Sequence, residues 1–210
     1  MIKHGLTKPR LSLLLAVVLL FSLGTANAET YNLRGYKSHG DWASTELYLG
    51  TTRYFRAVNA TDYSDTNLNV DYYPQDCSSP ALSARVEMEE IFSETQDVNL
   101  LPTDLRVDRH TIQSGLARIS TERGDSGLYF SFLVPDMPQL LKEMRAGTTL
   151  RFRIQREDTE PMFLEFGLRG SMAALNQAAS MCREASAGPE EYFEDESNGT
   201  DQRSDPEEYF

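Results

Sequence analysis

Cysteine, histidine and tryptophan are scarce in this sequence, which has two, three and one of them among 210 residues. There is no Cys-x-x-Cys pair and no histidine near either cysteine, so the spacings typical of redox motifs and zinc sites are missing. A Gly-x-Ser-x-Gly elbow, a His-Glu-x-x-His helix and a glycine-rich phosphate loop are missing as well. The sequence therefore predicts no catalytic residues, no metal and no cofactor.

Positive charge is also in short supply. The chain has 20 lysines and arginines against 32 acidic residues, a formal net charge of −12. Phosphate neutralisation supplies most of the affinity for nucleic acid, and anionic headgroups attract basic segments. We therefore expect neither a nucleic-acid partner nor peripheral binding to acidic lipid.

Only one long apolar run occurs, at residues 11–23. Three basic residues precede it, and small residues ending at Ala28 follow it, which is the layout of a cleavable secretory signal. The run is too short to span a bilayer, which takes about 20 residues. We expect residues 1–28 to be removed, leaving a periplasmic or secreted chain with no stable membrane insertion and a net charge of −15, because the signal carries three positive charges and no acid.

The two cysteines, Cys77 and Cys182, are 105 residues apart. In an oxidising compartment an isolated pair is most simply one disulfide, whose closure would stabilise the fold by up to about 4.7 kcal/mol. The alternatives are a redox pair or half of a metal site, and neither has a supporting motif nearby.

Residues 29–184 have the pattern of one β-rich domain. Apolar and polar residues alternate at 68–73, 86–89, 150–155 and 162–168, with shorter candidates at 46–49, 53–58 and 116–121. The segment 128–134 is apolar on both faces, which predicts a central strand, and glycines at 124–127 suit a turn before it. Many short strands at this spacing favour an antiparallel β-sandwich or partial barrel. Trp42 is interpreted as a core residue.

Two helices interrupt the strands. The first is expected at 138–146, with Pro138 in its first turn and Gly147 at its end. The second is expected to begin near Ser171, taken as its N-cap, and to continue through Met181. Cys182 falls on the apolar face of this helix, so a disulfide would attach the helix to the segment that follows the strand at 68–73.

Residues 185–210 are interpreted as a disordered acidic tail, because from residue 183 onward ten acids face two arginines. Within it, Pro189-Glu190-Glu191-Tyr192-Phe193 recurs as Pro206-Glu207-Glu208-Tyr209-Phe210. Each copy resembles a short docking motif, and duplication raises apparent affinity for a partner with two sites. The terminal copy also has a free carboxylate of the kind that a PDZ-type groove captures. The alternative is a duplicated acidic tail that serves solubility only.

Alternation places Arg151 and Arg153 on one strand face, with Arg169 as a candidate neighbour. Guanidinium groups in a row suit a carboxylate or phosphate, and the acidic tail of the same chain is a candidate partner. The alternative is an ordinary solvated strand face.

Several residues of the types found in active sites are scattered along the chain. Asp108-Arg109-His110 could accompany a serine nucleophile, and neighbouring glutamates could form a glycosidase pair. The residues concerned are Asp108, Arg109, His110, Ser114, Ser120, Glu87, Glu89 and Glu90. No motif joins them, so the expectation is a protein that is not an enzyme.

The stretch Phe166-Gly167-Leu168-Arg169-Gly170-Ser171-Met172-Ala173-Ala174-Leu175, continuing to Cys182, resembles the end of some exported bacterial β-domains, in which a Phe-x-Leu-x-Gly strand leads into an alanine-rich helix. The families it resembles are the invasion-associated locus B-like periplasmic proteins and small periplasmic accessory proteins of type VI secretion loci. The resemblance covers about the last fifty residues of the body. It implies a compact β-sandwich or partial barrel that acts as a binding or accessory factor, with no active site to transfer.

We therefore expect an exported, non-enzymatic binding or accessory protein of a Gram-negative envelope, with a protein partner recruited by the tail. Two alternatives stay open at this point. One is a hydrolase of envelope polymers with an unrecognised site. The other is a carrier of a small ligand, which would need an apolar cavity between the sheets rather than a packed core.

Overall fold

A computed structural model describes residues 31–60, 66–156 and 159–187, and these form a mainly β protein with two helices. The predicted signal at 1–28 and all of the repeated motifs at 189–193 and 206–210 lie outside the described residues. The strands are β1 Asn32–His39, β2 Trp42–Leu49, β3 Thr52–Ala60, β4 Asn67–Tyr73, β5 Asp76–Glu87, β6 Gln96–Val107, β7 Gln113–Thr121, β8 Gly127–Leu133, β9 Thr149–Ile154 and β10 Met162–Gly167. The helices are α1 Met137–Ala146 and α2 Ser171–Ser186.

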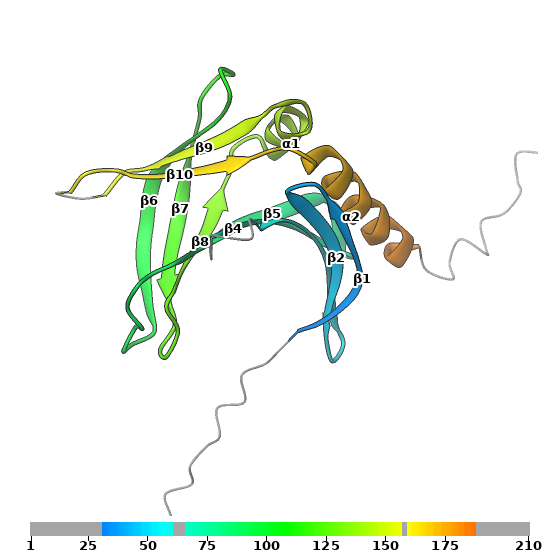
Figure 1. Cartoon of the computed structure of the whole chain (residues 1–210), viewed down its shortest axis with the longest axis horizontal. Helices are drawn as coiled ribbons and strands as arrows, with labels where there is room; N and C mark the ends of the chain where they lie inside the picture. Colours follow the sequence, from blue (N-terminus) through cyan, green and yellow to red (C-terminus); the bar gives the residue numbers. More distant parts are fainter. Residues whose placement is uncertain (1–30, 61–65, 157–158, 188–210) are drawn as a thin grey trace, which may run out of the picture.

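The ten strands form one antiparallel sheet in the order β1-β2-β3-β4-β5-β8-β7-β6-β9-β10. Strands β1–β5 follow one another as a meander, and β5 then pairs with β8 instead of β6. The hairpin β6–β7 fills the space beyond β8, and β9–β10 extends the sheet from β6 (Figure 1). The mainly β class is confirmed, and the partial barrel describes this single sheet better than the sandwich.

The sheet curls strongly, and its concave face holds the core. Phe132 on β8 stacks on Phe152 on β9 with ring centroids 4.4 Å apart, although β7 and β6 separate these strands in the sheet. Phe152 also meets Phe166 of β10 edge to face. Each of these rings is at most 5% exposed, so aromatic packing fills the fold of the sheet.

A seam joins the two ends of the curled sheet. The indole Nε1 of Trp42 on β2 donates a 2.9 Å hydrogen bond to the carbonyl of Gly167 at the end of β10, and Asn59 Nδ2 of β3 donates to the same carbonyl at 3.2 Å. Beside them Arg169 forms an ion pair with Asp41, with Nε 3.0 Å from Oδ2. Trp42 is 1% exposed, so its interpretation as a core residue is confirmed.

Helix α2 covers the concave face of β1–β4 with its small residues, and α1 packs beside it. A disulfide links Cys182 on α2 to Cys77 at the start of β5, which is the attachment expected from the sequence. Ser186 in the last turn of α2 donates a hydrogen bond to the carbonyl of Pro74 at 2.6 Å, so the same end of the helix is held twice. None of the helices in the described part of the chain is long and apolar enough to cross a membrane.

Several elements differ from the sequence expectations. Two strands were missed, β1 and β6, and β6 contains Pro102, a residue that usually argues against an inner strand. Strand β8 is central, but its outward Leu133 is 56% exposed, so the strand is buried on one face only. Helix α2 continues to Ser186, and Gly170 rather than Ser171 occupies its N-cap position.

The disulfide closes a loop of 105 residues, so its removal should release considerable conformational entropy in the unfolded chain. We expect the Cys77→Ser, Cys182→Ser double variant to lose about 2–5 kcal/mol of unfolding free energy in urea at neutral pH. Adding reductant to the wild-type protein should produce a similar loss and should leave the variant unchanged. Equal stability of the oxidised and reduced wild type would contradict a stabilising role.

Candidate functional site

The turn after β6 is held by one carboxylate. Asp108 Oδ1 accepts hydrogen bonds from the Thr148 hydroxyl at 2.6 Å and the Thr149 amide at 3.0 Å, and Oδ2 accepts from the Thr148 amide at 2.9 Å. The Asp108 amide in turn donates to the carbonyl of Thr149 at 2.9 Å. These four bonds attach the end of β6 to the start of β9.

Asp108 is also the one non-glycine residue with positive φ in the described part of the chain, at +45°. Aspartate tolerates this region better than most residues because its short side chain can bond locally. The chain approaches closely here, since a Cβ on Gly147 would lie 2.3 Å from Val107 Cγ1 and 2.9 Å from Asp108 Oδ2. A glycine between α1 and β9 therefore lets Thr148 reach the carboxylate.

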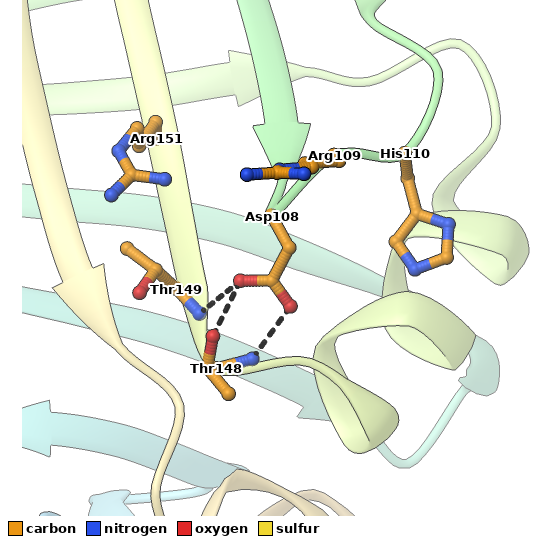
Figure 2. A pocket seen from close by; sticks show the side chains of 6 residues that line it. All are labelled: Asp108, Arg109, His110, Thr148, Thr149 and Arg151. Carbon is orange, nitrogen blue, oxygen red and sulfur yellow. Dashed lines mark hydrogen bonds between the residues drawn. The ribbon is translucent and has the colours of Figure 1, made fainter.

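An open pocket of about 560 Å³ lies on this turn. Its lining combines guanidinium, imidazole and hydroxyl groups with one carboxylate, and consists of Asp108, Arg109, His110, Thr148, Thr149 and Arg151. In the view of Figure 2, Arg151 and His110 lie on opposite sides of Asp108, and Arg109 lies between them.

Positive groups exceed negative ones around the pocket. Arg151 lies directly opposite Arg106 in the β6–β9 register, and like charges in that position repel. Arg151 forms an ion pair with Glu165 at 2.7 Å, while Arg106 Nε donates to the carbonyl of Asp108 at 2.9 Å. Arg109 has no acidic partner among the described residues and is exposed.

The predicted arginine row is present in part. Arg151 and Arg153 do lie on the same outer face of β9, but each is paired, Arg153 with Asp104 of β6. Arg169 does not join the row, because it forms the ion pair at the seam with Asp41. The row is therefore a set of cross-strand ion pairs, and the surplus of positive charge lies at Arg106 and Arg109.

Asp108 is poorly suited to act as a base. The Thr148 hydroxyl, followed by the amides of Thr148 and Thr149, lowers the pKa of this carboxyl below its ordinary value. His110 lies 3.9 Å from Glu143 on α1, which is itself buried. The Asp108–His110 pair thus shares a pocket, but the carboxylate bonds to Thr148 and Thr149 rather than to the imidazole.

The two serines considered as nucleophiles have other hydrogen-bond partners than a histidine, or none, in the described part of the chain. Ser114 donates its hydroxyl to Asp104 Oδ1 at 2.7 Å, and this bond, with Arg153, lowers the pKa of the Asp104 carboxyl. His39 instead bonds the hydroxyl of Ser44 at 2.9 Å. Among the interactions of residues 31–60, 66–156 and 159–187, none joins Ser114 or Ser120 to a histidine.

The glutamate group at the end of β5 is a second polar cluster. Arg85 bridges Glu87 and Asp125, and Glu87 accepts a hydrogen bond from the Ser126 hydroxyl. The Tyr129 hydroxyl, the Gly127 amide and Arg85 together lower the pKa of Asp125 to about 2. The cation between the two carboxylates makes this a structural ion-pair network around the β7–β8 turn rather than a pair of free carboxylates.

The structure thus brings together Asp108, Arg109, His110 and Arg151 around one pocket, whose lining includes none of the other candidates. Sequence reasoning missed Thr148 and Thr149, and it did not connect Arg109 with Arg151. Their meeting depends on the β6–β9 register, for which no local motif exists. No group of three or more potential metal ligands occurs within the described ranges.

We expect Asp108→Asn to lower the unfolding free energy by about 1–2 kcal/mol, because the amide keeps one acceptor and tolerates positive φ but loses the acceptor for the Thr148 amide. The folded-state pKa of Asp108 is depressed, so its contribution is present above the ordinary carboxyl pKa and lost as pH falls through the folded value.

Urea unfolding of both proteins between pH 7 and pH 2 measures this difference. The gap between wild type and variant should close below about pH 4. The control is Asp97→Asn, which removes an exposed ion pair with Arg118 and should change little at any pH. A gap of the same size at pH 2 and pH 7 would contradict a role for the carboxylate.

No protein-family model matches the sequence, and no curated protein matches it. Among solved structures, the chain is similar to the crystal structure of invasion associated protein B from Bartonella henselae, with a TM-score of 0.45 and 17% sequence identity. The similarity covers 70% of this chain and 96% of that chain. By its name, the Bartonella protein belongs to the first of the two groups that residues 166–175 resemble, the invasion-associated locus B-like proteins.

Proposed function

We propose that this chain is an exported, non-enzymatic binding protein of the bacterial envelope, and that its pocket at the β6–β7 turn receives an acidic segment of a protein partner. The observation that carries the proposal is the surplus of guanidinium groups around Asp108 in a chain of net charge −12. The rest of this acidic protein repels carboxylates, so a positively charged pocket attracts them to one place on its surface.

The pocket can exchange its present ion pair for a new one at little cost. The Arg151 and Glu165 side chains are 52% and 61% exposed, and ion pairs at that exposure contribute little to stability. Arg109 needs no exchange, because it lacks an acidic partner among the described residues. A carboxylate placed between these two arginines would gain charge-assisted hydrogen bonds from both.

The arrangement favours a peptide over a single small anion. Arg106 lies directly opposite Arg151 on the outer face of β6 and β9, so the surplus of positive charge extends from Arg109 onto this part of the sheet face. Residues directly opposite on paired strands are about 5 Å apart, which suits a segment with more than one carboxylate. The disulfide supports the exported location of such a protein, because disulfides persist mainly outside the cytoplasm.

The tail is the second proposed contact. Each copy of Pro-Glu-Glu-Tyr-Phe offers two aromatic side chains beside acids, the composition of a short docking segment. Under this proposal the internal copy, residues 189–193, enters a groove on the partner while the pocket binds an acidic segment of that partner. Two weak contacts on one chain reinforce each other through effective concentration.

To test the pocket, the mature chain with an N-terminal affinity tag is cross-linked in isolated envelopes, and captured proteins are quantified by mass spectrometry. We expect Arg109→Gln to reduce the recovered partner by about tenfold, the loss of roughly one charge-assisted bond. The matched control is Arg123→Gln, an exposed arginine on the β7–β8 turn with the same change in charge. Equal recovery with the two variants would refute the pocket's role.

To test the tail, Tyr192→Ala and Phe193→Ala are combined in the same capture assay. Truncating two aromatic anchors is expected to lower recovery of the partner by about tenfold or more. The folded body should keep its urea midpoint, since these residues follow the last described helix. Full recovery of the partner by this variant would count against docking through the internal copy.

A further inference from the structure

The geometry points to an occupant for the pocket within the chain itself: we propose that the terminal copy, Pro206–Phe210, seats in the Asp108–Arg109–Arg151 pocket of its own chain and competes there with the partner. This inference rests on the proposed function, because it takes the pocket to be an acidic-peptide site. It adds the identity of the resident peptide and a reason for having two copies.

The chemistry of the two surfaces is complementary. The terminal copy carries the carboxylates of Glu207 and Glu208, and Asp205 directly precedes it. The pocket offers the guanidinium groups of Arg109 and Arg151, with Arg106 directly opposite Arg151. Carboxylates this close together can each accept charge-assisted hydrogen bonds from a guanidinium group.

The length of chain after α2 separates the two copies. The start of α2 lies near the pocket, because the Leu168 amide donates to the carbonyl of Thr148 at 2.8 Å and Ser171 Oγ bonds the carbonyl of Met144 at 2.6 Å. From there α2 runs away from α1 (Figure 1) and ends beside the turn between β4 and β5, where Ser186 bonds Pro74. Its 16 residues are about 24 Å long. A segment that follows α2 must return over this distance to reach the pocket.

The internal copy cannot make that return. Glu191 is four residues beyond Ala187, and four extended residues span at most about 14 Å. The terminal copy begins 19 residues beyond Ala187, which allows up to about 66 Å. Chain length therefore excludes the internal copy from the pocket of its own chain, allows the terminal copy to reach it, and leaves the internal copy available to a partner.

Competition at the pocket has a functional consequence. A resident terminal copy lowers the apparent affinity of the pocket for other acidic segments, because the tether keeps the resident at high effective concentration. A partner engaged by the internal copy would then displace the terminal copy, so the two contacts with the partner form in sequence. The pocket is protected from unrelated acidic peptides until docking has occurred.

The test uses the full mature chain with a photoreactive p-benzoylphenylalanine in place of Tyr209, and a matched chain in which it replaces Tyr192. A mixture of isotope-labelled and unlabelled protein distinguishes cross-links within a chain from those between chains. We expect position 209 to cross-link to pocket residues of its own chain, about fivefold or more above position 192, and Arg109→Gln but not Arg123→Gln to reduce this yield by a similar factor. The yield should also fall as salt rises.

Cross-links from position 209 that are absent, that map elsewhere, or that join only different chains would each overturn the inference. Partner capture separates this failure from a failure of the proposed function. If Arg109→Gln still reduces capture while the within-chain cross-link is missing, the pocket binds a partner and only the resident peptide is wrong. If both measurements are unaffected by Arg109→Gln, both proposals fail. Support requires the within-chain cross-link and a rise in capture for Tyr209→Ala, Phe210→Ala.

Discussion

The carbonyl of Gly167 accepts hydrogen bonds from Trp42 and Asn59, and through it the two ends of a single ten-stranded sheet are drawn together. The next amide, that of Leu168, bonds the carbonyl of Thr148, whose own amide and hydroxyl hold Asp108. The seam that closes the core and the turn that forms the pocket are thus neighbours in one continuous set of hydrogen bonds. Because backbone groups take part on both sides of Thr148, a shift of β10 along β9 would separate the Leu168 amide from the Thr148 carbonyl and uncouple the seam from the Asp108 turn.

This arrangement divides the molecule into a rigid part and an adjustable part. The core side of the sheet is packed with aromatic rings, and α2 is held by a disulfide and by Ser186, so the body offers a fixed frame. The outer face near the pocket is made of exposed ion pairs that can change partners cheaply. Binding of an acidic segment at such a site, as proposed, would need no rearrangement of the core.

Sequence periodicity was informative where one face is buried and the other is polar. Strands β9 and β10 and the helix that carries Cys182 follow that rule, so their faces could be assigned before the structure was known. Strand β2 buries Ser44, Thr45 and Glu46 on both faces, which breaks the expected alternation, and β6 contains a proline. The pocket was not predictable either, because Asp108 and Thr148 are 40 residues apart and meet only through the strand register. Arg169 was expected beside Arg151 and Arg153 but pairs with Asp41 instead. That contact could not be predicted for the same reason, because the two residues are 128 positions apart.

The central claim is that Arg109 holds a carboxylate of the terminal copy in the intact chain, and side-chain NMR of arginine tests it most directly. The measurement is the hydrogen-exchange rate of the guanidinium Nε–H groups in the uniformly labelled mature protein at low and high salt. We expect the Arg109 group to exchange several times more slowly than that of Arg123 at low salt. At about 1 M salt the Debye length falls to about 3 Å and screening weakens the ion pair, so the two exchange rates should become similar. Identical exchange of Arg109 and Arg123 at every salt concentration would contradict the account.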